Sequence, residues 1–250
     1  MLIGLCGGIC AGKHSVAATL VDHHGFQRIS LTRTISTPAV EKTASDARLP
    51  ESNLNEPTQI FANIDMLSDF VTKRWQERWV TTDIWDEEVL EVLLRKPFFL
   101  LVSVDAPVSV RWRRFKRRCD DHALEPPSLE QFVLRNDDHL YNSKTGLAKL
   151  IERAQVRLLN STSSIETLQD ALKALDLTDE KRLRPTWDQY FMRLASLAAQ
   201  RSNCMKRRVG CVLVREKRVI STGYNGTPRN LTNCNEGGCK DVSLDSFEQR

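Results

Sequence analysis

The sequence predicts an α/β fold, with a doubly wound parallel sheet followed by the first part of a second, smaller α/β domain. Two observations support this prediction. Apolar runs at 1–6, 26–31 and 98–105 alternate with segments of helical periodicity, which is typical of a parallel sheet covered on both faces. After residue 184 the order changes to one helix and two strands, which indicates that a different domain begins there.

Composition limits the classes of function. The chain has 250 residues, of which 41% are hydrophobic, so one or two packed domains are expected. Its net charge of +4 suits anionic small molecules and is too small for a dedicated nucleic-acid binder. Seven cysteines without a signal peptide indicate reduced thiols, and no apolar run is long enough for a membrane helix. We therefore expect a soluble cytoplasmic or nuclear protein that contacts neither nucleic acid nor membrane.

The first elements can be placed from local signals. The run at 1–6 suits a buried strand, and a helix is expected over 13–24 because Gly25 can close it. A second strand follows at 26–31. Residues 36–58 combine three prolines with many Ser, Thr, Asn and Glu, and this composition predicts a mobile insertion.

The alternation continues through the middle of the chain. A helix is expected over 65–80, with Met66, Phe70 and Trp75 facing inward, and a strand at 81–85. The further expected elements are a helix at 87–95, a strand at 98–105, a basic helix from 110, a strand from 156 and a helix at 165–175.

A glycine-rich loop separates the first strand from the first helix. Gly7, Gly12 and Lys13 satisfy G-x-x-x-x-G-K in the strand–loop–helix context of a P-loop, where backbone N–H groups and a lysine hold phosphate oxygens. His14 stands where a Mg²⁺-binding Ser or Thr is needed, and Ser15 points about 100° further around the helix. The motif predicts a degenerate phosphate-binding loop with ATP as the candidate ligand. The alternative is that the glycines only serve the turn.

The N-terminal part resembles small P-loop kinases, dephospho-CoA kinase among them. The resemblance rests on Val-Asp-Ala-Pro at 104–107 with six cations over 111–118, and on 156–163 with its following helix. In such kinases, Arg residues after the Asp-Ala-Pro turn help to cover phosphates; a solvated helix face is the alternative here. No acidic residue is evident after the second strand. Residues 1–177 are assigned to this domain and 178–184 to a charged linker.

The C-terminal part begins with an expected helix over 187–202, with Trp187 and Phe191 on its apolar face, and two expected buried strands at 209–214 and 218–222. Its sequence resembles the deoxycytidylate (dCMP) deaminases of fungal type. The matching stretches are WDQYFMRLASLAAQRSNCMKRRVGCVLV, STGYNGTP and NCNEGGC. The resemblance implies zinc-dependent hydrolysis of dCMP to dUMP for thymidylate synthesis, and dCTP and dTTP as effectors.

The catalytic motifs of that family are missing from the sequence. A zinc deaminase uses His-x-Glu and Pro-Cys-x-x-Cys, yet no His follows His139 and no C-x-x-C occurs. Residues 185–250 are therefore expected to form an incomplete, truncated deaminase domain without activity. Two alternatives stay open: a nucleotide or dephospho-CoA-type kinase, and a non-catalytic nucleotide-binding or subunit-pairing protein. Homo-oligomerisation is also left open.

Four residues of this part are candidate site residues. By resemblance Asn225 contacts the nucleotide sugar; the alternative is a turn Asn before Gly226. Cys204 and Cys234 match positions that hold a structural zinc with two later His, against idle thiols as the alternative. Arg201 is a candidate phosphate contact together with the basic run 206–208, against a solvated loop. Cys211, in a predicted strand, is expected to lie in the core.

Overall fold

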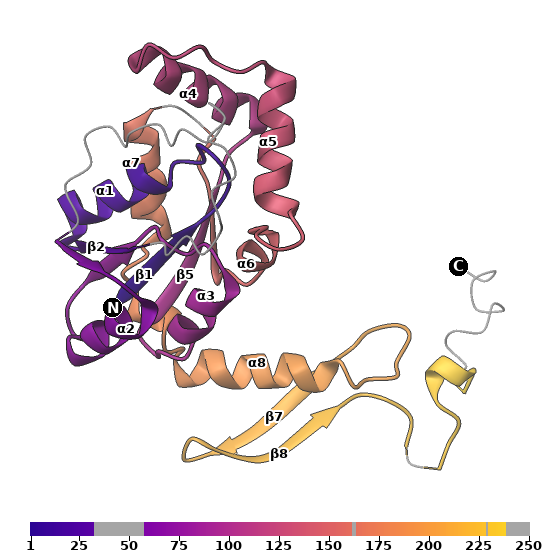
Figure 1. The fold of residues 1–250 in the computed structure, drawn as a ribbon. Helices are drawn as coiled ribbons and strands as arrows, with labels where there is room; N and C mark the ends of the chain where they lie inside the picture. The colour runs from indigo at the N-terminus through magenta and orange to yellow at the C-terminus, as the bar shows by residue number, and fades with distance from the viewer. Residues whose placement is uncertain (33–57, 162–163, 229, 239–250) are drawn as a thin grey trace. The chain divides into compact units, whose positions relative to one another are not determined.

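A computed structural model describes residues 1–32, 58–161, 164–228 and 230–238 (Figure 1). The chain divides into two compact units, Met1–Leu183 and Arg184–Arg250. Across the described residues, every helix is too short or too polar to cross a membrane.

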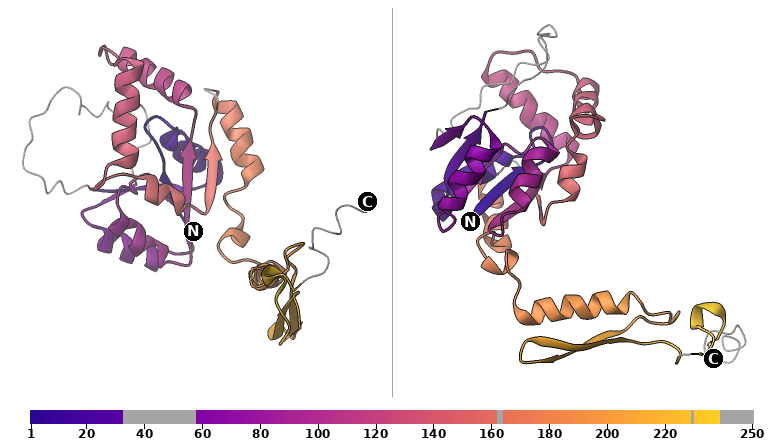
Figure 2. Two further views of the ribbon diagram at one scale, coloured as in Figure 1. Left: turned by 90° about the vertical axis from the view of Figure 1, so that its right-hand side faces the viewer. Right: turned by 60° about the horizontal axis from the view of Figure 1, so that its bottom comes forward.

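A six-stranded parallel sheet forms the centre of the first unit, in the order β3-β2-β4-β1-β5-β6 (Figures 1 and 2). Its strands are β1 (Leu2–Cys6), β2 (Gln27–Leu31), β3 (Gln59–Phe61), β4 (Trp79–Thr81), β5 (Phe99–Asp105) and β6 (Val156–Leu159). All strand pairs are parallel. The predicted α/β class with a parallel sheet is therefore confirmed.

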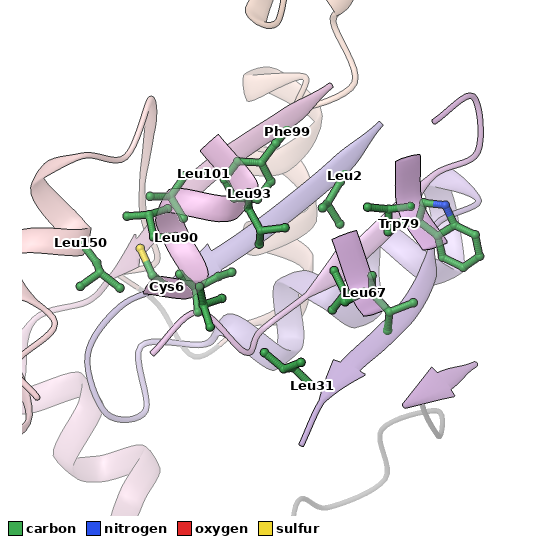
Figure 3. Close-up of a cluster of buried hydrophobic side chains, with 14 of the residues drawn as sticks. Leu2, Cys6, Leu31, Leu67, Trp79, Leu90, Leu93, Phe99, Leu101 and Leu150 are labelled. Atoms are coloured by element: carbon green, nitrogen blue, oxygen red, sulfur yellow. The ribbon is translucent and has the colours of Figure 1, made fainter. Parts of the chain in front are cut away.

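Helices cover both faces of this sheet. They are α1 (Lys13–His24), α2 (Ile64–Lys73), α3 (Glu87–Leu94), α4 (Val108–Asp121), α5 (Leu129–Tyr141), α6 (Ala148–Glu152) and α7 (Ile165–Leu175). Successive residues of β1 point to opposite faces: Leu2 packs with side chains of α2, α3 and the α6 region, as Figure 3 shows, whereas Ile3 packs with those of α1 and α7. Burial on both faces explains why β1 reads as a continuous apolar run.

The predicted helix over 65–80 is wrong in its second half. Helix α2 ends at Lys73, and Trp79 and Val80 belong to strand β4, which lies between β2 and β1. Met66 and Trp75 are exposed rather than inward, and only Phe70 packs against the core. The apolar pattern fits both periods, and pairing with β1 decides the outcome.

The remaining helices of the first unit include predicted and unpredicted ones. Helices α1 and α7 have the predicted bounds, and Gly25 closes α1 in the left-handed conformation. Helices α5 and α6 have no counterpart in the sequence prediction. The insertion predicted at 36–58 lies, apart from its last residue, outside the described residues.

The second unit consists of helix α8 (Trp187–Ala199) and the antiparallel hairpin of β7 (Gly210–Arg215) and β8 (Arg218–Tyr224). Thr186 and Gln189 form a capping box at the start of α8. The helix lies close to the hairpin: a Cβ on Gly210 of β7 would stand only 2.2 Å from the carbonyl oxygen of Ala195 in α8.

The two strands of this hairpin are not buried, contrary to the sequence prediction. Along β7 partly buried and exposed residues alternate, and nearly all of β8 is exposed. Leu213 is 62% exposed and Ile220 59%. Cys211, expected in the core, is also exposed. Within the described part of this unit, α8 covers one face of a two-stranded sheet, so the other face stays open.

Candidate functional site

The loop between β1 and α1 has the backbone of a tight glycine-dependent turn. Gly7 has φ 145° and Gly12 has φ 106°, both in the region that favours glycine. A Cβ on Gly7 would stand 2.1 Å from the carbonyl oxygen of Val104, so the loop lies directly against the carboxyl end of β5. Gly12 begins α1 without a side-chain cap, and the first turn of α1 contains no acidic residue.

Lys13 folds back over this loop. Its Nζ donates to the carbonyl oxygens of Gly7, at 3.0 Å, and Gly8, at 3.1 Å. The pKa of Lys13 lies below its ordinary value because burial penalises the ammonium; the Cys10 and Cys6 thiols oppose this effect, and Arg111 and Arg118 add to it. The structure therefore brings Gly7, Gly12 and Lys13 together, with additional positive charge beside them.

That charge comes from α4, the basic helix after β5. Arg111 is only 4% exposed, and its Nε donates to the carbonyl oxygen of Ala106 at 2.8 Å. Its Nη1 donates to the side-chain oxygen of the buried Asn136, and a Cβ on Gly8 would stand 2.6 Å from the same Nη1. The guanidinium thus lies against the glycine loop, with neutral oxygens as its hydrogen-bond partners.

Arg114 and Asn160 fasten the second half of the loop. Arg114 Nη1 donates to the carbonyl oxygens of Cys10 and Ala11, at 3.2 and 3.1 Å. Its Nη2 donates to the backbone and side-chain oxygens of Asn160, both at 3.1 Å, and Asn160 Nδ2 donates to Ala11 at 3.0 Å. Burial is the main reason why the pKa of Arg114 is lowered. Of the two interpretations of the basic helix, Arg111 and Arg114 fit contact with the loop, whereas Arg113, Lys116 and Arg117 are exposed.

Asp83 is a polar group that sequence reasoning missed. It follows β4, and its Oδ2 accepts from the Ser30 hydroxyl at 2.7 Å and the Leu31 N–H at 2.9 Å, at the end of β2. An acidic group therefore lies at the carboxyl end of the second strand, although it comes from another strand. Only the pairing of β2 with β4 reveals it, since no short-range sequence signal links the two.

In the second unit, Asn225 ties the end of β8 to the segment before β7. Its Oδ1 accepts from the Val209 N–H at 2.8 Å and the Ser202 hydroxyl at 2.7 Å, and its Nδ2 donates to the Arg207 carbonyl oxygen at 2.8 Å. The Ser202 hydroxyl also lies 2.8 Å from the backbone oxygen of Asn225. The amide is therefore largely used within the chain, and it holds the 202–209 loop in place.

The same loop carries Cys204. Backbone hydrogen bonds from Arg207 and Lys206 lower the pKa of this thiol, and the Asn225 side chain and the Lys206 charge act in the same direction. Asn203 Nδ2 donates to the Asn233 side-chain oxygen, which places the residues before Cys204 and Cys234 in direct contact. The two candidate cysteines thus lie on adjoining segments.

Arg201 directly precedes Ser202, which bonds to Asn225. Its side chain is exposed, as are those of Lys206, Arg207 and Arg208. Four exposed cations therefore lie on or directly before the 202–209 loop, where a phosphate group can reach them.

The chain is similar to known deaminases. The family model described as the cytidine and deoxycytidylate deaminase zinc-binding region matches residues 185–237. A deoxycytidylate deaminase of Schizosaccharomyces pombe is 43% identical over 247 residues, which cover 95% of this chain and 69% of that protein. One of Saccharomyces cerevisiae is 38% identical over 252 residues, with 96% and 69% covered.

Two solved structures are similar at a lower level. An uncharacterized protein from Eubacterium ventriosum has a TM-score of 0.41 and 14% identity, over 70% of this chain and 97% of that chain. A sugar kinase from Janibacter sp. has a TM-score of 0.38 and 18% identity, over 71% and 95%.

Residues 185–237, which include α8 and the β7–β8 hairpin, thus match the zinc-binding region of the cytidine and deoxycytidylate deaminases. Because the two fungal relatives match along almost the whole of this chain, the chain belongs to the deoxycytidylate deaminase family. It spans 69% of the length of each of these relatives.

The family implies zinc, and the residues can be tested against it. Among the described residues, no three His, Cys, Asp or Glu lie close enough together to hold a metal ion. The sequence contains neither His-x-Glu nor Pro-Cys-x-x-Cys. The catalytic zinc therefore has no ligand set in these residues. A structural zinc fits better, since Cys204 and Cys234 lie on adjoining segments and the Cys204 thiolate is stabilised, but two further ligands are needed. The next cysteine along the chain, Cys239, lies outside the described residues.

Proposed function

We propose that this chain takes part in the hydrolytic deamination of dCMP to dUMP, which supplies thymidylate synthesis. The observation that supports the proposal is the combination of family membership with an ordered loop at Ser202–Val209 and Asn225, in the matched zinc-binding region. In this proposal Asn225 orients the nucleotide sugar with its remaining hydrogen-bonding capacity, and Arg201 faces the phosphate.

The residues that would bind the catalytic zinc and move protons are not among these 250. When bound, zinc supplies a hydroxide at neutral pH by lowering the pKa of a water molecule to about 7. The part of the reaction that the present residues support is binding and orientation of dCMP. Cys204 and Cys234 are proposed as half of a structural zinc site, and dCTP and dTTP as effectors.

The test is dUMP release at saturating dCMP, compared between residues 1–250 and a chain extended by the His-x-Glu and Pro-Cys-x-x-Cys segments of a fungal relative. We expect no turnover above the uncatalysed rate from residues 1–250, with or without added zinc. The extended chain should be active and should lose its activity with a chelator. Turnover by residues 1–250 that a chelator abolishes would contradict this expectation.

A second candidate function concerns the first unit, which we propose is a P-loop kinase-like domain over 1–177 that binds phosphate groups without transferring them. The contacts of Lys13 with Gly7 and Gly8, and the arginines beside the loop, support phosphate binding. His14 in place of a hydroxyl residue speaks against a working Mg·ATP site. The segment 178–184 is then the link to the deaminase domain at 185–250.

His14→Ser tests this second function. It returns an oxygen ligand for Mg²⁺, so Mg·ATP should bind more tightly to the variant than to the unchanged chain in isothermal titration calorimetry. Steady release of ADP by the unchanged chain, with dCMP or dephospho-CoA as acceptor, would contradict the assignment.

A further inference from the structure

The glycine loop of the first unit is surrounded by positive charge that reaches it from a distant part of the sequence. Lys13 lies on the loop, Arg111 lies against Gly8, and Arg118 Nη1 lies 3.9 Å from the sulfur of Cys10. Arg111 and Arg118 both disfavour the charged form of Lys13. Cations gathered in this way repel one another, and a bound anion would relieve the repulsion.

Arg111 is the strongest sign of a ligand. Buried charges are normally paired with an opposite charge, because an unpaired buried ion is costly. Arg111 is 4% exposed, yet its hydrogen-bond acceptors in the described part of the chain are a carbonyl and an amide oxygen, both neutral. Its Nη2 makes no hydrogen bond there. The guanidinium is thus held in position with donors to spare, beside a loop with phosphate-binding geometry.

The backbone of the glycine loop also favours an anionic ligand. The carbonyl oxygens of Gly7, Gly8 and Ala11 accept bonds from Lys13, Arg114 and Asn160, so each of these oxygens already has a hydrogen-bond donor. The N–H groups of Gly8, Ile9 and Gly12 make no hydrogen bond within the described residues. Unused N–H groups at an uncapped helix start, with satisfied carbonyls, favour an anion over a cation.

We propose that this loop binds a polyphosphate without Mg²⁺, with Lys13, Arg111 and Arg118 supplying the positive charge that the metal ion supplies elsewhere. The inference rests on the proposed phosphate-binding function of the same loop and names its ligand class. Guanidinium groups suit the task because they stay charged and match phosphate oxygens in pairs. The missing hydroxyl at residue 14 is then no defect, since no metal needs to be held there.

The experiment is isothermal titration calorimetry of the full 250-residue chain with inorganic tripolyphosphate, ATP and adenosine. Each is measured once in excess EDTA and once in excess Mg²⁺. We expect tripolyphosphate and ATP to bind in EDTA, and to bind no more tightly in Mg²⁺, because the metal competes for the phosphate charge. Adenosine should not bind. If ATP binds at least tenfold more tightly than tripolyphosphate, the natural ligand is a nucleotide; similar affinities indicate that the phosphate chain alone is recognised.

Two variants on one helix provide the matched comparison. Arg118→Ala removes a partly buried cation beside the loop and should weaken binding in EDTA at least tenfold. Arg117→Ala removes an exposed cation one position away and should change it less than twofold. Arg111→Met is a third variant; if it fails to fold, the Arg118 and Arg117 pair still decides the question.

The outcomes separate the inference from the function on which it rests. Absence of binding in both conditions would overturn the phosphate-binding function itself. Binding in Mg²⁺ but not in EDTA would keep that function and overturn the metal-free inference. Equal effects of Arg118→Ala and Arg117→Ala would overturn the role of the α4 cations.

Discussion

Replacing Asn225 by Ala should loosen the second unit before it affects any ligand. The substitution removes the side-chain hydrogen bonds to Val209, Ser202 and Arg207. Each such bond contributes about 0.5–1.5 kcal/mol, and values near the lower end apply because Asn225 is only half-buried. The expected loss in local stability is therefore about 2 kcal/mol, which corresponds to roughly 30-fold faster opening of the loop.

Hydrogen exchange measured by mass spectrometry on peptides covering 202–210 is the assay. Asn235→Ala is the control, because Asn235 is exposed and its side chain makes no hydrogen bond within the described residues. Asn225→Asp should fall between the two, since it keeps both acceptor bonds and places an oxygen against the Arg207 carbonyl. If the 202–210 peptides of Asn225→Ala exchange at the rate of the unchanged chain, the Asn225 side chain does not stabilise the 202–209 loop.

Three further outcomes follow from the geometry. Gly7→Ala should destabilise the first unit by about 3 kcal/mol in urea unfolding, because Gly7 has a positive φ and the added Cβ would stand 2.1 Å from the Val104 carbonyl oxygen. The control is Gly25→Ala, which should cost about 1 kcal/mol, because Gly25 has φ 67° but the added Cβ would meet nothing within 4 Å. Cys204 should react with iodoacetamide at lower pH in the native chain than in urea, since hydrogen bonds lower its pKa. Burial raises the pKa of Cys6 to about 11 and should keep that thiol unreactive in the native chain. Equal reaction rates of Cys204 and Cys6 in the native chain would refute this. Limited proteolysis should cut 184–250 before the first unit, because the hairpin exposes apolar side chains; survival of that segment would contradict it.

The lowered pKa of Cys204 also makes the stability of the 202–209 loop depend on pH. A thiol whose pKa is lower in the folded state than in the unfolded state stabilises the fold in its ionised form. This contribution is fully present above the ordinary thiol pKa and is lost as the pH falls through the lowered value. The 202–209 loop should therefore exchange faster at neutral than at alkaline pH once intrinsic exchange rates are divided out, and Cys204→Ser should remove the difference.

Local signals in the sequence predicted those elements that local interactions determine. Gly25 caps the end of α1 and Ser164 caps the start of α7, and both helices have the predicted bounds. The strand predicted at 81–85 was placed too late, since β4 runs from Trp79 to Thr81. Nothing within 74–80 breaks the helical pattern, and β4 is defined by its pairing with β1 and β2. Cys211 was placed in the core because an apolar strand looks buried from its sequence, whereas its burial depends on what covers the hairpin.

The residues of the candidate site in the first unit also fall into two groups, those that local spacing identifies and those that only the fold brings together. The motif alone identified Gly7, Gly12 and Lys13, because their spacing is local. Nothing in the sequence linked Asn136 or Asn160 to that loop, since they reach it from α5 and from the end of β6. The six cations of 111–118 could not be sorted from their sequence either, because only the packing of α4 shows which of them face the loop.

In both units the residues marked as ligand contacts also hold the backbone. Lys13 bonds to two loop carbonyls, and Asn225 bonds to both ends of the 207–209 segment. If substituting either residue abolishes ligand binding, the cause is therefore ambiguous, because the substitution is also expected to deform the site. Arg118 is partly buried and Arg201 is exposed, and substituting either removes a positive charge while keeping the loop bonds that Lys13 and Asn225 make. For that reason charge removal at these two arginines, rather than at Lys13 or Asn225, is the sharper probe of anion binding in the first unit and of phosphate recognition in the second.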